Sequence, residues 1–392
     1  MKIKFGFLVV LPLAVASASA SFQDRNQQAE DQKPITVAAT LVQVPAVVTD
    51  KNGKFVTGLS REDFTVSEDG KHQEISHFAP INQPFNCVLV LDTSNSTEDR
   101  LGAIRSTAVS FTRQSGPEDR MMILTFDNEV RELTDLTANK PELEAAIRGA
   151  ETGFGKLLYE AVTRALERLK DVEGRRAVVL FSDGVDMRSI EATAESSVQL
   201  AEQIGAVIYC VKFDTRWWIE AEARRQEIEH PRSKTLGNID GRIPVPPEMG
   251  GPEVDVGGFP KPNSPRIEVG SGRSPPVVTD PGRGRQSSRI PSSDPSDQIG
   301  HTLDKLYGEA DGYLQTLASR TGGRMLAAET LESSRSAFSA IAEELRSQYL
   351  VGYYATHSKR DGKYHKIKLE VARKGVQVRA RLGYRSPAGK RD

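Results

Sequence analysis

The 392-residue sequence has few of the residues that form disulfides or bind zinc: it has two cysteines and six histidines. The cysteines and histidines show none of the close spacings that zinc ligands need. Two cysteines are also too few for the disulfide framework of a small secreted domain. The Gly-x-Ser-x-Gly nucleophile elbow of α/β-hydrolases is absent. The sequence therefore gives no sign of a zinc centre with closely spaced ligands, and it lacks the commonest serine-hydrolase motif.

Neither sign of charge is in excess, because the chain has 52 basic and 53 acidic residues and a formal net charge of −1. That balance gives no reason to expect nucleic acid or an anionic membrane surface as a partner. No stretch after the N-terminus approaches the roughly 18 apolar residues of a membrane span. We therefore expect no membrane insertion of the mature protein.

The first 20 residues have the three parts of a secretory signal peptide. Lys2 and Lys4 make the start positive, residues 5–15 are apolar, and Ala18-Ser19-Ala20 offers a small-residue cleavage site. We expect a signal peptide at 1–20, a polar leader at 21–33, and a mature protein that is secreted or periplasmic.

Strand patterns occupy both ends of the remaining chain, at residues 34–82 and 347–387. Asn52-Gly53 and Asp69-Gly70 are strong hairpin turn signals in the first of these regions. Each region alone is short for a stable sandwich, but together they offer about seven strands, the size of an immunoglobulin-like domain. We expect one β-sandwich built from both termini, with residues 84–346 inserted between its halves.

The inserted region alternates strands and helices. The run Arg120–Phe126 predicts a strand, apolar residues at helical spacing from Leu158 to Leu169 predict a helix, and Leu331–Arg346 predicts another. This alternation is typical of a doubly wound parallel sheet, so we expect an α/β domain inside the β-sandwich. Residues 231–300 break the pattern because they are rich in Pro, Gly and Ser, and we expect this insertion to be disordered.

Oxygen ligands follow two of the predicted strands. Asp92, Ser94 and Ser96 come at and after the end of the strand that contains Cys87, and Asp183 follows a second apolar strand. Ligands of open α/β sheets collect at the carboxyl ends of the strands. Carboxylate and hydroxyl oxygens suit Mg²⁺, Mn²⁺ or Ca²⁺ and suit zinc and copper poorly. The sequence therefore predicts a site for a hard divalent cation at this edge of the sheet.

The spacing of Asp92, Ser94 and Ser96 resembles the metal-ion-dependent adhesion site (MIDAS) of von Willebrand factor type A (vWA) domains. The whole arrangement is similar to a bacterial group of exported proteins described as von Willebrand factor A-related. The other matching features are Gly58-Leu59 ahead of Glu62-Asp63-Phe64, Glu68-Asp69-Gly70, Thr321-Gly322-Gly323-Arg324, and Glu344-Leu345-Arg346-Ser347-Gln348-Tyr349. The resemblance implies ligand binding through a divalent cation whose coordination a partner carboxylate completes, and it implies no catalysis.

One position departs from the family's pattern. The family has a metal-binding Thr shortly before a helix start, and Lys156 stands at that place here. An ammonium is repelled by a cation and would itself occupy the metal's place against Asp92 and Asp183. Thr152 is the residue that would act as the ligand instead if the loop shifts.

The strand order of this fold also bears on Cys87 and Cys210. It places the strand that ends at Asp183 between theirs, so two strand spacings, about 9.6 Å, separate the cysteines. A disulfide tolerates at most roughly 7 Å between Cα atoms. We expect two free, buried thiols that behave as small hydrophobic residues.

Three functions are compatible with these residues. The first is an exported, non-enzymatic, adhesion-type module that captures an acidic partner group through a divalent cation at Asp92, Ser94, Ser96 and Asp183. The second is a metal-free interaction scaffold in which Lys156 fills the metal position and the sandwich or the Pro-rich segment makes the contacts. The third is a phosphoryl-transfer enzyme with Asp92 as its nucleophile, which ranks lowest because the usual second Asp of haloacid-type phosphatases is Ser94 here.

Overall fold

The computed structural model describes three stretches of the chain, all within one compact unit, Ala39–Asp392: residues 41–229, 297–355 and 361–388. The predicted signal peptide, the polar leader and nearly all of the insertion predicted at 231–300 lie outside the described residues. Within the described stretches, no helix is both long enough and apolar enough to cross a membrane.

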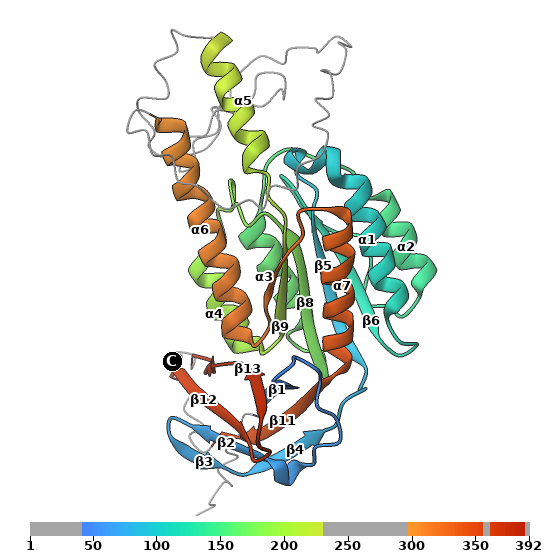
Figure 1. The fold of residues 1–392 in the computed structure, drawn as a ribbon, viewed down its shortest axis with the longest axis vertical. Coiled ribbons are helices and arrows are strands. Elements are labelled where there is room, and N and C mark those ends of the chain that lie inside the picture. The colour runs from blue at the N-terminus through green and yellow to red at the C-terminus, as the bar shows by residue number, and fades with distance from the viewer. Residues whose placement is uncertain (1–40, 230–296, 356–360, 389–392) are drawn as a thin grey trace, which may run out of the picture. The chain divides into compact units, whose positions relative to one another are not determined.

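The inserted region is built around a six-stranded sheet with the strand order β10-β9-β8-β5-β6-β7 (Figure 1). Its strands are β5 (Phe85–Asp92), β6 (Arg120–Phe126), β7 (Val130–Glu132), β8 (Arg175–Ser182), β9 (Val207–Lys212) and β10 (Met325–Ala327). β7 runs antiparallel to β6, and the other neighbours are parallel. The central strands β5 and β8 are buried on both faces, which explains their continuous apolar runs. The predicted doubly wound parallel sheet is confirmed.

Helices cover both faces of this sheet (Figure 1). One face carries α1 (Leu101–Gln114), α2 (Lys140–Gly149) and α7 (Leu331–Arg346), and the other carries α3 (Leu158–Leu169), α4 (Ala194–Ile204) and α6 (Gln298–Thr321). Alternate residues of β5 serve the two cores: Leu89 shares one with Ile104 of α1, and Val90 shares the other with Leu166 of α3. A last helix, α5 (Arg216–Glu229), packs against α6.

Two four-stranded antiparallel sheets form the β-sandwich, with the orders β13-β1-β11-β4 and β14-β12-β2-β3. Their strands are β1 (Leu41–Asp50), β2 (Phe64–Glu68), β3 (Lys71–Gln73), β4 (Ile75–Ala79), β11 (Gln348–Tyr354), β12 (Tyr364–Val371), β13 (Val376–Ala380) and β14 (Gly383–Arg385). Each sheet combines strands from both chain ends, because β11 pairs with β1 and β4 while β12 pairs with β2. Val44, Val66 and Tyr349 join in one core between them. The predicted sandwich of both termini is confirmed.

Three elements differ from the sequence prediction. β7 and α2 are not anticipated, because β7 has only three residues, none of them buried, and α2 buries only Leu143 and Ile147. α6 begins at Gln298, inside the segment predicted to be disordered at 231–300. The Asp297 side chain caps this helix by accepting a hydrogen bond of 2.9 Å from the Gly300 amide, so the predicted insertion ends too late.

Both cysteines are free and buried, as predicted. Cys87 lies in β5 and Cys210 in β9, with β8 between them. Burial raises the pKa of the Cys210 thiol to about 12, and it raises the pKa of Cys87 as well. Two protonated, inaccessible thiols have no reactive role at neutral pH.

Candidate functional site

The carboxyl ends of β5, β8 and β9 meet at one edge of the six-stranded sheet, and a polar side chain lies at the end of each. Asp92 ends β5, Asp183 follows β8, and Thr215 follows β9. Asp92 and Asp183 are completely buried, and Thr215 is 1% exposed. Buried polar groups need hydrogen-bond or ionic partners, and the three residues find them in one another and in the neighbouring loops.

Asp92 is held by the hydroxyls of two serines. Ser94 Oγ donates to Asp92 Oδ1 at 2.5 Å, the Ser94 amide donates to the same oxygen at 3.1 Å, and Ser182 Oγ donates to Oδ2 at 3.0 Å. Ser96 Oγ lies 3.2 Å from Ser94 Oγ. The predicted residues Asp92, Ser94 and Ser96 therefore gather in one place, although their role as metal ligands stays a prediction.

Lys156 brings its ammonium to the gap between the two aspartates. Its Nζ contacts Asp183 Oδ2 and lies 3.8 Å from Asp92 Oδ2, and its side chain is 2% exposed. The amides of Met187 and Arg188 donate to the Lys156 carbonyl at 3.0 and 3.1 Å, which fixes the backbone from which this side chain projects. The lysine therefore lies where the sequence predicts a cation.

Asp183 has further partners from the neighbouring strands. Thr215 Oγ1 donates to Asp183 Oδ2 at 2.5 Å, and the Val185 amide donates to Oδ1 at 3.0 Å. The Tyr307 hydroxyl lies 2.7 Å from Thr215 Oγ1 and extends the network to α6. Every oxygen of the two aspartates thus has a hydrogen-bond donor or the ammonium beside it.

Charge and burial act against each other in this cluster. Burial by itself lowers the pKa of Lys156, but the negative charges of Asp183 and then Asp92 outweigh it and hold the pKa above its ordinary value. Burial raises the pKa of Asp92; the Lys156 charge opposes this rise and the Asp183 charge adds to it. Lys156 therefore carries its full positive charge at neutral pH.

These contacts do not fit a divalent cation while Lys156 keeps its place. A hard cation needs several oxygens at 2.0–2.6 Å from one point. Here Asp183 Oδ2 already takes the ammonium and the Thr215 hydroxyl, and Asp92 Oδ1 takes the Ser94 hydroxyl. An ion beside Nζ would also be repelled by its charge.

Thr152 stays a prediction as the alternative ligand. Its neighbour Gly153 forms a bridge with Ser94 and donates its amide to the Thr93 carbonyl at 2.9 Å. In the described part of the chain, the half-buried Thr152 side chain makes no hydrogen bond to Asp92 or Asp183. The loop is therefore tied to the end of β5 by its backbone.

Large apolar side chains stand exposed on the loops and at the helix starts that follow the carboxyl ends of these strands. Phe154 is 50% exposed two residues before Lys156, Ile190 is 72% exposed in the loop after Asp183, and Trp217 is 59% exposed two residues after Thr215. Leu331, 40% exposed, begins α7 after the edge strand β10. Among the described residues, these are four of the six large hydrophobic side chains that are exposed.

Three members of the polar network are missing from the sequence prediction. Ser182 and Thr215 come at or just after strand ends, so the rule that ligands collect there would have found them. Tyr307 carries no such signal, because it lies in the middle of α6 and 92 residues from Thr215 in the sequence.

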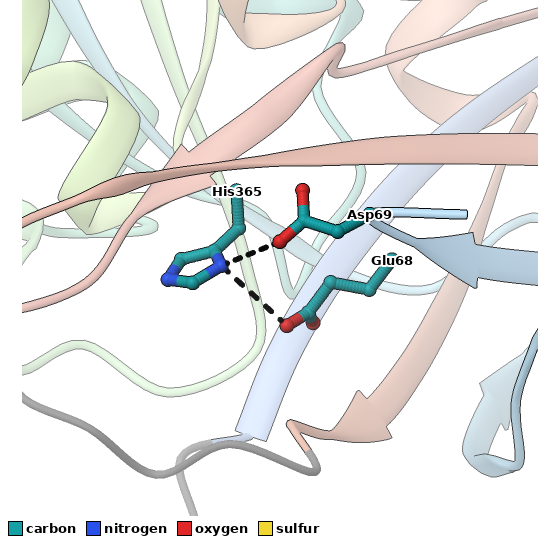
Figure 2. Close-up of side chains that lie close together, drawn as sticks. All are labelled: Glu68, Asp69 and His365. Carbon is teal, nitrogen blue, oxygen red and sulfur yellow. Dashed lines mark hydrogen bonds and ion pairs between the residues drawn. The ribbon is translucent and has the colours of Figure 1, made fainter. Parts of the chain in front are cut away.

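A second polar cluster lies in the β-sandwich, where Figure 2 shows Nδ1 of His365 turned toward the carboxylates of Asp69 and Glu68. The two distances are 2.9 Å to Asp69 Oδ2 and 3.8 Å to Glu68 Oε1. Glu68 is 3% exposed and also accepts hydrogen bonds from the Tyr353 and Tyr384 hydroxyls. The cluster joins the β2–β3 turn to β12, and its donor set of one imidazole and two carboxylates is one that a cation could use.

The von Willebrand factor type A domain family model matches residues 87–185, which include most of β5, Lys156 and Asp183. No curated protein matches the chain. The solved structures to which it is similar include an aerotolerance-related membrane protein from Bacteroides fragilis, with 13% identity over 67% of this chain and 98% of that one and a TM-score of 0.37. Another is the vWF domain of the type V pili tip protein Mfa5 from Porphyromonas gingivalis, with 14% identity, 67% and 95% coverage and a TM-score of 0.34.

A third similar structure is proximal thread matrix protein 1 from the mussel byssus with a zinc-occupied MIDAS motif, with 17% identity, 34% and 36% coverage and a TM-score of 0.31. At such identities and TM-scores, these likenesses carry no functional argument. The family match, the strand order of the sheet and the position of Asp92 at the end of β5 agree with one another. The chain therefore contains a vWA domain, which the family model matches over residues 87–185.

Proposed function

We propose that this protein is an exported, non-catalytic interaction module that binds a protein partner at the carboxyl edge of its six-stranded sheet, with Lys156 in place of a divalent cation. One observation carries the proposal: the buried Lys156 ammonium contacts Asp183 and lies 3.8 Å from Asp92. The signal-peptide pattern at residues 1–20 supports export. This modifies the second of the three functions that the sequence allows: Lys156 fills the metal position as in that function, but the contacts lie at the edge of the six-stranded sheet and not on the sandwich or the Pro-rich segment.

Lys156 removes the electrostatic reason for metal binding. Two carboxylates attract a divalent cation strongly, but two carboxylates and an ammonium carry a formal charge of only −1. A cation that displaced the lysine would also have to break the buried contact of its ammonium with Asp183. The network around Asp92 and Asp183 then serves to hold the loops in position.

The exposed apolar side chains around this network, on a loop at Phe154 and at the start of α5 at Trp217, supply the binding surface. Phe154 and Trp217 lie within two residues of members of the buried network, so their backbones are fixed by it. Large aromatic side chains on a fixed backbone are the anchors that contribute most to protein–protein affinity. A surface of this kind binds without a metal bridge.

Catalysis by Asp92 is not supported by the same geometry. The Asp92 carboxylate is completely buried and accepts hydrogen bonds from Ser94 and Ser182. A nucleophile for phosphoryl transfer has to reach the phosphorus atom, and these contacts leave Asp92 no free approach. We therefore retain the non-enzymatic function.

Cation-bridged capture of a partner carboxylate remains a second candidate, because the oxygens of Asp92, Ser94, Ser96 and Asp183 all lie around the same place. In that mechanism Mg²⁺, Mn²⁺ or Ca²⁺ would have to displace the Lys156 ammonium. The partner would then bind only when the ion is present, which separates the two candidates in one experiment.

The test is capture of secreted or periplasmic proteins of the source organism on the immobilised mature protein, with and without a chelator. We expect the same partner in both conditions and its loss with Phe154→Ser/Trp217→Ser. The matched control is Tyr354→Ser/Leu382→Ser, which removes exposed hydrophobic residues of the sandwich (49% and 54% exposed). Loss of the partner on chelation would support the cation bridge instead, and loss only in the control would move the surface to the sandwich.

A further inference from the structure

A groove on a different face of the domain is lined by four arginines. It has a volume of about 710 Å³, and its lining residues are Gly102, Arg105, Ser106, Val109, Ser110, Arg113, Arg148 and Arg335. We propose that this groove binds an extended acidic segment of a protein partner. The proposal goes beyond the function proposed above and does not depend on Lys156 or on the loops at the carboxyl edge.

α1 forms the floor of the groove. Its contributing residues lie at positions 102, 105, 106, 109, 110 and 113, which is the spacing of a single helix face. α1 packs between α7 and α2 (Figure 1), and these helices supply Arg335 and Arg148 as the two walls. The lining residues of α1 between the arginines have small side chains, which leaves the groove open above the helix. At Gly102 an added Cβ would meet nothing within 4 Å.

Two of the arginines already bind a carboxylate of the chain. Arg113 donates to both oxygens of Glu144, Nε to Oε1 at 2.6 Å and Nη2 to Oε2 at 2.7 Å, and Arg148 adds a third bond at 3.3 Å. The hydrogen bond from Arg113 is the main reason that the pKa of Glu144 falls to about 2. The groove therefore stabilises a carboxylate in its ionised form.

The other two arginines keep their charge available. Arg105 donates to the Ala150 carbonyl, and Arg335 donates to Ser106 Oγ at 3.3 Å. Neither forms an ion pair with an acidic side chain in the described stretches of the chain. Four guanidinium groups and the single carboxylate of Glu144 leave a formal charge of +3 at the groove, on a chain whose net charge is −1.

The lining selects carboxylates on an extended chain. Val109 is the only apolar side chain of the lining and is 5% exposed, so the groove offers little to an apolar ligand. It contains no aromatic ring on which a nucleobase could stack. A guanidinium group donates two parallel hydrogen bonds to the two oxygens of one carboxylate. From Gly102 to Arg113 α1 rises about 16 Å, which an extended peptide spans with about five residues.

Fluorescence anisotropy of a labelled hexaglutamate peptide with the mature protein, at low ionic strength, tests the proposal. We expect saturable binding that weakens as salt is raised, and at least tenfold weaker binding by Arg105→Glu/Arg335→Glu. The neutral variant Arg105→Gln/Arg335→Gln should fall between the two. The matched control, Arg164→Glu, reverses a 55% exposed arginine of α3 on the opposite face and should change binding less than twofold.

Absence of saturable peptide binding by the wild type would overturn the proposal, and so would an equal loss with Arg164→Glu. Tighter binding of a hexathymidylate probe would assign the groove to nucleic acid and overturn the acidic-protein partner. Thermal unfolding of each variant confirms that it folds. Phe154→Ser/Trp217→Ser should leave peptide binding unchanged. Loss of partner capture in that variant and loss of peptide binding in Arg105→Glu/Arg335→Glu therefore test the two proposals separately.

Discussion

At the scale of single residues, the site depends on one buried ammonium between two buried carboxylates. Lys156 is attached to the chain, so its charge is present at any concentration of free ions, and Asp92 and Asp183 never face each other without it. A metal ion in this position would have an open coordination position for a partner. The 2% exposed Lys156 side chain offers no such position, which directs the search for partner contacts to the loops above it.

Replacing Lys156 by methionine should destabilise the fold strongly at neutral pH. The variant keeps most of the side chain's volume but leaves Asp92 and Asp183 buried without a counter-charge. Breaking one side of a buried ion pair typically costs about 3–5 kcal/mol. Urea unfolding at pH 7.5 measures the difference. A change below about 1 kcal/mol would mean that the ammonium does not hold the aspartates together.

The same substitution should have an effect that depends on pH. The pKa of Lys156 is raised in the fold, so its contribution is complete below the ordinary value of 10.5 and disappears only as the pH rises through the higher, folded value. In Lys156→Met the pKa of Asp92, already raised by burial, loses the opposing charge of the lysine.

A carboxyl with a raised pKa destabilises the fold above that pKa and ceases to do so once it is protonated. The difference in unfolding free energy between wild type and Lys156→Met should therefore be largest near neutral pH and shrink as the pH falls toward 4. Urea unfolding across this pH range provides the measurement. A difference that grows on acidification would contradict the assignment of charges.

The sequence predicts part of this site for a physical reason. Parallel strands bring Asp92 and Asp183 to one edge, so their proximity follows from the strand pattern alone. The family pattern also points to Lys156 as the residue at the metal position. The contact of its Nζ with Asp183, and the part played by Tyr307, depend on loop and helix positions that no local pattern encodes.

At the scale of elements, α7 shows how local chemistry fixes a boundary. Thr330 Oγ1 accepts the Ser333 amide at 3.0 Å, and Ser333 Oγ accepts the Thr330 amide at 2.8 Å, which is a reciprocal cap. This cap and the apolar spacing after Leu331 explain why the sequence predicts the helix correctly. α2 also has a cap, from Asn139, but only two of its residues are buried, which is too few for the apolar residues of the sequence to show helical spacing.

Thr330→Ala should lower the unfolding free energy by about 1 kcal/mol, within the range of about 0.5–2 kcal/mol seen for lost caps. The control is Thr316→Ala in the interior of α6, where the exposed hydroxyl only donates to the Gly312 carbonyl of its own helix. Chemical unfolding of both variants checks the expectation. Equal effects would show that the cap contributes nothing of its own.

At the scale of the whole molecule, the sandwich requires both ends of the chain. β11 lies between β1 and β4 in one sheet, and β12 lies between β14 and β2 in the other. The strand patterns predict this arrangement because neither end supplies enough strands alone. The pairing register, such as Val44 opposite Val351, could not be predicted. Apolar residues alternate along both strands, so a shift by two residues would bury the same kinds of side chain.

Removal of every residue after Arg346 should therefore destroy the sandwich, while residues 84–346 keep the α/β fold. Two fragments test this. We expect the first, residues 41–346, to bind a hydrophobic dye and to associate, because β1 and β4 lose the strand between them. The 84–346 fragment should unfold cooperatively on heating. If the 41–346 fragment stays monomeric and binds no dye, the N-terminal strands form a stable structure by themselves and the two-terminus sandwich is not required.

Thermal unfolding of the chelator-treated mature protein, with and without millimolar Mg²⁺, Mn²⁺ or Ca²⁺, tests most directly whether Lys156 takes the place of the cation. The account predicts no shift for the wild type and a shift for Lys156→Thr, which removes the ammonium and adds a hydroxyl ligand. An ion at a hundred times its dissociation constant stabilises a fold by about 2.7 kcal/mol. A shift of that size in the wild type that persists in His365→Ala, which removes a ligand of the second cluster, would contradict the account, because it would mean that a cation binds at Asp92 and Asp183 while Lys156 is present.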